Sequence, residues 1–100
     1  MREIDVKTIS EAVKDMCISI NLELSEDMKE ALLKAEQEET NTLGTQILDI
    51  LKKNLEIAKS EGIPICQDTG MAVVFLEVGQ DVHFTGGNIE DAVNKGVAEG

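Results

Sequence analysis

A short polar segment holds the side chains of this sequence that are best suited to chemistry. Cys66, Gln67, Asp68 and Thr69 follow one another directly, and the only proline, Pro64, precedes them. A thiolate is a nucleophile or a soft metal ligand. A carboxylate can bind a substrate or transfer a proton, and a neutral amide both donates and accepts hydrogen bonds. Such groups gathered between two apolar elements indicate a ligand site, because sites are commonly built on loops that a rigid scaffold holds.

Each of these side chains also has a purely structural interpretation. A lone cysteine is more often a buried thiol that acts as a small apolar residue, and Asp68 with Thr69 can simply close a turn. A nucleophilic thiol needs a base, and His83 is the only histidine; we expect it on a partly exposed strand face without a special role. We interpret Cys17 as a core residue. Three hypotheses therefore stay open: a metal site, a cysteine-based redox or acyl-transfer enzyme, and a non-catalytic acidic interaction domain in which Cys66 is merely buried.

The composition argues against some partners. The chain of 100 residues is 42% hydrophobic, and its 20 acidic and 9 basic residues give a formal net charge of −11. Such a charge repels phosphate backbones and anionic membranes, so we expect no nucleic acid and no membrane as partners. No apolar run approaches the roughly 20 residues of a membrane span, and residues 1–5 lack the apolar stretch of a signal peptide. We expect a cytoplasmic protein whose cysteines are reduced.

The elements that position the polar segment follow from the spacing of apolar residues. Helical spacing predicts three helices before it. We expect them over residues 2–20, from Ser25 to about Glu38, and from Asn41 or Thr42 to Gly62. Ser25, Asn41 and Thr42 are residue types that cap helix starts. Gly62 and Pro64 end the third helix, since glycine adopts the left-handed conformation and proline cannot continue a helix.

The residues after the polar segment predict a small sheet and a last helix. Residues 71–78 are dense in β-branched and apolar side chains, which is typical of a strand covered on both faces. We expect this strand to form a hairpin with a second strand that begins at Val82, and Asn88 to cap a final helix. The fold class is therefore α+β and mainly helical: three N-terminal helices, a small β-hairpin or sheet edge, and a further helix.

Longer runs around the polar segment resemble a known enzyme family. The runs are IPICQDTG over residues 63–70, Val73-Val74-Phe75, and VGQDVH over residues 78–83. Together they resemble the class I, iron–sulfur-dependent hydro-lyases, which are the fumarate hydratases and L(+)-tartrate dehydratases. The resemblance covers nearly the whole sequence. It implies that residues 1–100 are the N-terminal part of a hydro-lyase alpha subunit, a single and truncated domain.

The resemblance also implies roles for three residues. The family holds a [4Fe–4S] cluster with three cysteines, and Cys66 matches the first of them. Gln67 and Asp68 match residues that line the substrate pocket, and Asp68 is the catalytic candidate among them. The implied reaction is the reversible hydration of fumarate to malate. Residues 78–83 favour fumarate over tartrate as the substrate.

The same resemblance implies that this chain is incomplete as an enzyme. Cys17 does not occupy a ligand position of the family, so the other two cluster cysteines lie outside this sequence. The substrate-binding arginines and the remaining proton-transfer residue are expected outside it too. We therefore expect the fragment alone to be inactive. Its expected partners are a dicarboxylate substrate and a beta subunit or C-terminal domain, in a homo- or hetero-oligomer.

Overall fold

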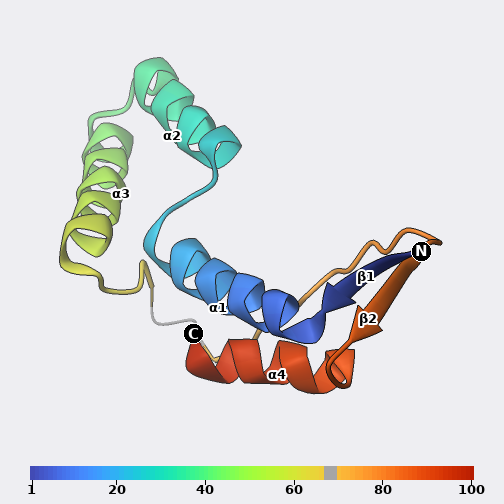
Figure 1. Cartoon of the computed structure of the whole chain (residues 1–100). Coiled ribbons are helices and arrows are strands. Elements are labelled where there is room, and N and C mark those ends of the chain that lie inside the picture. The colour runs from blue at the N-terminus through green and yellow to red at the C-terminus, as the bar shows by residue number, and fades with distance from the viewer. Residues whose placement is uncertain (67–69) are drawn as a thin grey trace. The chain divides into compact units, whose positions relative to one another are not determined.

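The computed structural model describes residues 1–66 and 70–100, which form two compact units. The first unit holds residues 1–19 and 70–100, and the second begins at Ile20. The elements are β1 (Arg2–Asp5), α1 (Val6–Leu22), α2 (Glu26–Glu38), α3 (Thr42–Glu61), β2 (Val82–Thr85) and α4 (Ile89–Glu99) (Figure 1). The predicted α+β, mainly helical class is confirmed. None of the helices in the described ranges has the length and hydrophobicity of a membrane span.

The first unit begins with a strand where the sequence predicted a helix. β1 pairs with β2 in parallel, so the helix start expected at residue 2 is wrong. α1 begins only at Val6, and the Asp5 carboxylate accepts a hydrogen bond from the Lys7 backbone N–H at 2.9 Å. This bond satisfies one of the free donors of the first helical turn. α1 then extends to Leu22, two residues beyond the expected end at residue 20. The partner strand lies near the other end of the sequence, so local periodicity could not reveal it.

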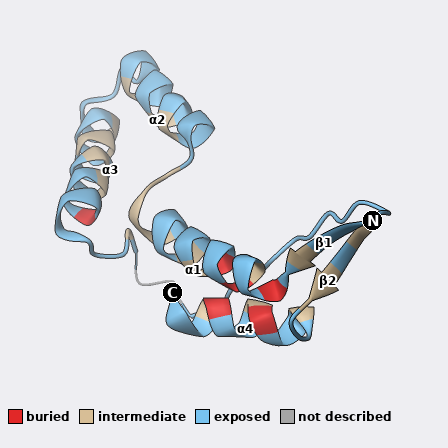
Figure 2. Cartoon of the chain, in the orientation of Figure 1, coloured by how far each residue is buried: buried red, intermediate tan, exposed pale blue. Residues whose placement is uncertain are grey.

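The core of the first unit lies between α1 and α4, which pack side by side (Figures 1 and 2). The buried residues of these two helices are Val6, Ser10, Val13, Ala92 and Gly96. Gly96 permits the close approach: a Cβ atom there would lie 2.5 Å from the Ser10 carbonyl oxygen and 2.8 Å from Val13 Cβ. The Ser10 carbonyl oxygen is a backbone atom of α1, so it cannot rotate out of the way as the end of a flexible side chain could. The contact between the two helices therefore depends on the missing side chain at Gly96.

Residues 71–79 do not form the predicted strand. They contain no regular secondary structure, and their apolar side chains are exposed: Met71 is 90% exposed and Phe75 91%. The predicted hairpin is also wrong, because β2 pairs with β1 instead. A strand is stable only where a neighbour completes its ladder of hydrogen bonds and covers its apolar face. The sequence shows the propensity of residues 71–78, but no strand among the described residues pairs with them.

The second unit contains α2 and α3, and both follow the sequence predictions. Ser25 stands at the N-cap position of α2. Asn41, one of the two expected caps of α3, accepts hydrogen bonds from the backbone N–H groups of Leu43 and Gly44 at 2.9 and 3.3 Å. Asn88 caps α4 in the same way, as predicted. Lys52 of α3 pairs with Glu36 of α2 across 3.8 Å, so α2 and α3 contact each other through a charged as well as an apolar surface.

We predict that Gly96→Ala destabilises the chain, although alanine is the better helix former. The propensity gain is about 1 kcal/mol, whereas forcing a packed contact apart costs about 1–3 kcal/mol. The free energy of unfolding, measured by urea titration with circular dichroism, should therefore fall. Gly79→Ala is the control, because its added Cβ would lie 3.8 Å from the Val82 side chain, an ordinary contact. A Gly96→Ala chain as stable as the original would contradict the packing described.

Candidate functional site

Cys66 lies in a turn just beyond the end of α3. The helix stops at Gly62, which adopts the left-handed conformation with φ 65°, a conformation that strains other residues. The N–H of Gly62 and that of Ile63 both donate to the carbonyl of Ala58. Pro64 then follows and has no N–H for a further helical turn. The sequence prediction of this helix end is confirmed, and it brings the chain sharply away from α3 before Cys66.

Ile65, the residue before Cys66, is held by both of its backbone groups. Its N–H donates to the carbonyl oxygen of Asn21, in the last turn of α1, at 2.7 Å. Its carbonyl oxygen accepts a hydrogen bond from the side-chain amide of Asn54, on α3, at 2.8 Å. Within the second unit, the chain is therefore attached to the last turn of α1 and to α3 immediately before the cysteine.

Asn54 is the residue of this site that the sequence analysis missed. It lies on α3 beside the charged Lys52 and Lys53 and is exposed, so its type alone does not distinguish it from the solvated face. One signal was available. Asparagine is a poor helix former, because its side chain competes for backbone hydrogen bonds. An asparagine in the interior of a helix therefore indicates that its side-chain amide has a hydrogen-bond partner elsewhere.

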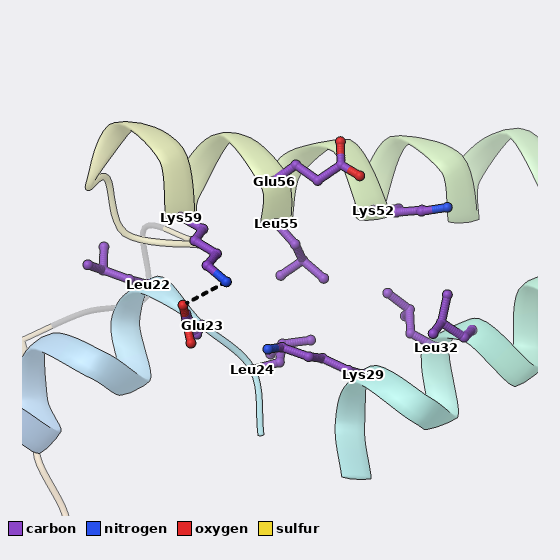
Figure 3. Close-up of a pocket in the computed structure, with 10 residues that line it drawn as sticks. Leu22, Glu23, Leu24, Lys29, Leu32, Lys52, Leu55, Glu56 and Lys59 are labelled. Atoms are coloured by element: carbon purple, nitrogen blue, oxygen red, sulfur yellow. Dashed lines mark ion pairs between the residues drawn. The ribbon is translucent and has the colours of Figure 1, made fainter. Parts of the chain in front are cut away.

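An apolar hollow of about 260 Å³ lies in the same unit (Figure 3). Leucines line it from the end of α1, the connector that follows, α2 and α3. They are Leu22, Leu24, Leu32, Leu33 and Leu55. Lys59 and Glu23 form an ion pair at its edge, with 3.2 Å between Nζ and the carboxylate oxygen. The lysines that line it are each paired with a glutamate, at 3.2–3.8 Å. This hollow therefore offers no unpaired lysine to an anionic ligand.

Cys66 is exposed and forms no disulfide. The alternative in which Cys66 is merely buried is therefore wrong for this structure. Gln67 and Asp68, the two predicted substrate-pocket residues, lie outside the described residues, so their roles stay predictions.

Two other residues singled out in the sequence belong to the first unit. His83 lies exposed on β2, as expected. Cys17, expected in the core, is half-buried on α1.

The chemistry open to this site follows from its donor set. Among residues 1–66 and 70–100 there is no group of three or more His, Cys, Asp and Glu side chains that could hold a metal ion. Cys66 is a single accessible sulfur donor on a turn with a fixed approach. A thiolate of this kind suits a soft metal or an iron–sulfur cluster. Either would need further ligands, and no group of them is found among the described residues.

Comparisons with known proteins identify relatives of this sequence. The family model described as fumarate hydratase (Fumerase) matches residues 10–100. A putative L(+)-tartrate dehydratase subunit alpha of Methanocaldococcus jannaschii is 33% identical over 75 residues, 75% of this chain and 26% of that protein. A putative class I fumarate hydratase of Geobacillus stearothermophilus is 25% identical over 95 residues, 94% of this chain and 18% of that protein.

A third relative is more similar over a shorter stretch. The anaerobic class I fumarate hydratase of Escherichia coli is 47% identical over 45 residues, which are 45% of this chain and 8% of that protein. The chain thus spans about a quarter or less of the length of these curated relatives. No solved structure matches it.

Proposed function

The chain belongs to the fumarate hydratase (Fumerase) family, and from this membership we propose that it is the N-terminal part of an iron–sulfur hydro-lyase. The proposed reaction is the reversible addition of water to fumarate, which gives malate. One observation supports the proposal most strongly: the exposed thiol of Cys66 lies within the matched residues, on a turn attached to α1 and α3.

We propose that Cys66 is one of three thiolates that hold a [4Fe–4S] cluster. Its exposure and its soft sulfur donor fit this group, because cysteine thiolates are the usual ligands of such clusters. When bound, the cluster supplies a Lewis-acidic iron that stabilises negative charge on the hydroxyl oxygen that is added or lost. In this proposal the other two thiolates come from outside this sequence, because the family resemblance matches no cluster ligand to Cys17, the only other cysteine of the chain.

Gln67 and Asp68 have complementary tasks in this proposal. The neutral amide of Gln67 orients a carboxylate of the substrate without adding charge. The carboxylate of Asp68 binds the substrate and moves a proton to or from the water that is added. Holding both groups against the substrate reduces the entropic part of the barrier. Their nearness in sequence to the anchored Ile65 supports these roles.

The charge of the chain supports a further partner. A dicarboxylate carries two negative charges, whereas this chain has a formal net charge of −11 and a single arginine, Arg2. Binding such a substrate requires cations that compensate its carboxylates. We propose that a beta subunit or a C-terminal domain supplies them within an oligomer, and that this chain alone is inactive. The name of the M. jannaschii relative, a subunit alpha, supports a two-subunit enzyme; we place that enzyme in the cytoplasm.

L(+)-Tartrate dehydration is the second candidate reaction. It is favoured by the M. jannaschii relative, whose similarity extends over 75% of this chain. The E. coli class I fumarate hydratase favours fumarate, since it is 47% identical, although over a shorter stretch. Both reactions interconvert a hydroxylated dicarboxylate and its dehydrated form by loss or gain of water, so the same three residues serve either one.

For the substrate, we predict that the complete enzyme has a higher kcat/KM for fumarate and malate than for L(+)-tartrate. Steady-state assays on both substrates with the same anaerobic preparation give the ratio directly. Turnover of tartrate without turnover of fumarate would replace the first reaction by the second and leave the cluster proposal standing.

For the cluster, we predict that Cys66→Ser in the complete protein lowers bound iron and sulfide and removes the brown visible absorbance, because serine offers no thiolate. Chemical iron and sulfide assays with absorption spectra measure this. Cys17→Ser makes the same change at the other cysteine of the chain and should retain the cluster. Unchanged iron and colour in Cys66→Ser would refute the proposed role.

For the proton transfer, we predict that Asp68→Asn lowers kcat by about 10²–10⁴-fold, the usual contribution of a positioned acid or base. Bound iron should stay unchanged, because the amide has the same shape and the cluster ligand is intact. If Asp68 only closes a turn, the asparagine side chain can close the same turn. In that case kcat stays close to that of the original enzyme, and the proposed proton transfer is refuted.

A further inference from the structure

Two consecutive peptide groups before Cys66 are fixed by partners outside the turn. The N–H of Ile65 belongs to the Pro64–Ile65 peptide group and donates to Asn21 at 2.7 Å. The carbonyl of Ile65 belongs to the Ile65–Cys66 peptide group and accepts from Asn54 at 2.8 Å. Because a peptide group is planar, each bond restrains a whole plane. The two bonds together restrict both backbone dihedral angles of Ile65.

The bond from Asn54 acts directly on the cysteine. The plane that contains the Ile65 carbonyl also contains the backbone nitrogen and the Cα atom of Cys66. Restraining the carbonyl oxygen therefore limits the movement of these two atoms as well. The position of the sulfur then depends on only two further rotations, φ and χ1 of Cys66. An unattached turn would leave the sulfur free to move with every residue from Gly62 onward.

The properties of Asn54 match this task. Its side chain is short, and its amide donates a hydrogen bond without carrying a charge. It can therefore hold the carbonyl beside an anionic thiolate ligand without adding a charge near that ligand. The neighbouring Lys53 pairs with Asp49 at 3.0 Å on α3 itself, as ordinary surface residues do. Asn54 instead reaches across 11 positions of the sequence to the turn. Nothing in the stability of the helix favours asparagine there.

We propose that Asn54 is a positioning residue of the iron–sulfur site, which aims the sulfur of Cys66 at the cluster by holding the Ile65 carbonyl. This inference rests on the proposed function, in which Cys66 is a cluster ligand. Hydrogen bonds behind a metal ligand reduce the freedom that the ligand loses on binding, and their removal typically lowers metal affinity by about 10–100-fold.

The test uses the complete enzyme with Asn54→Asp, which keeps the shape of the side chain but replaces the donor by an oxygen that repels the Ile65 carbonyl. We expect iron release to a chelator to become about 10-fold faster. We also expect the electron paramagnetic resonance signal of the cluster, recorded after one-electron reduction to its paramagnetic state, to shift. Gln46→Glu is the matched control: it makes the same change from amide to carboxylate on an exposed residue of α3 and should alter neither quantity. Asn54→Gln retains the donor on a longer stem and should restore most of the iron retention.

Hydrogen exchange separates failure of this inference from failure of the proposed function. In metal-free protein, Asn54→Asp should accelerate exchange of the Ile65 amide, because the carbonyl bond and the N–H bond hold the same residue. Equal exchange and equal iron release in Asn54→Asp and Gln46→Glu, with iron lost in Cys66→Ser, would overturn the role of Asn54 alone. Iron unaffected by Cys66→Ser would overturn the ligand role, and with it the purpose assigned to Asn54.

Discussion

The attachment of Ile65 is the constraint on which the rest of this site depends. The carbonyl of Asn21 and the amide of Asn54 take up both backbone groups of this residue at 2.7 and 2.8 Å. Hydrogen bonds of these lengths are well formed, and they connect the turn to α1 and α3. Without them a proline-containing turn of exposed residues would sample many conformations. With them, the backbone just before Cys66 is restrained against the two helices. A cysteine that binds a cluster needs such a defined starting position.

The described residues do not by themselves supply all the groups that the proposed reaction requires. Its charge is strongly acidic, its described residues hold no metal-binding group of three or more side chains, and the apolar segment at residues 71–78 is exposed without a strand partner. A dicarboxylate needs cations and a cluster needs several thiolates. Each of these needs is met in the proposed enzyme by residues outside the sequence. In that proposal the chain is one wall of a larger site. It spans about a quarter or less of the length of the curated relatives.

The sequence predicted what local chemistry determines and failed where distant partners decide. Asn41, Gly62 and Asn88 were placed correctly as helix ends, because a cap acts within one turn of its own position. Residues 2–5 were predicted as a helix, and residues 71–78 as a strand. Both errors have one cause: strand formation depends on a neighbour that sequence patterns do not identify. Family resemblance supplied the proposed role of Cys66, whereas Asn54 became visible only through its contact with Ile65.

The central claim is that the sulfur at position 66 is bonded to iron. Replacing Cys66 with selenocysteine in the complete enzyme would make this atom visible to X-ray absorption at the selenium edge, because no other selenium is present in protein grown without selenomethionine. The account predicts an iron neighbour at bonding distance from selenium, in a preparation that retains its brown colour. A selenium surrounded only by carbon and other light atoms in an iron-loaded, active enzyme would contradict it.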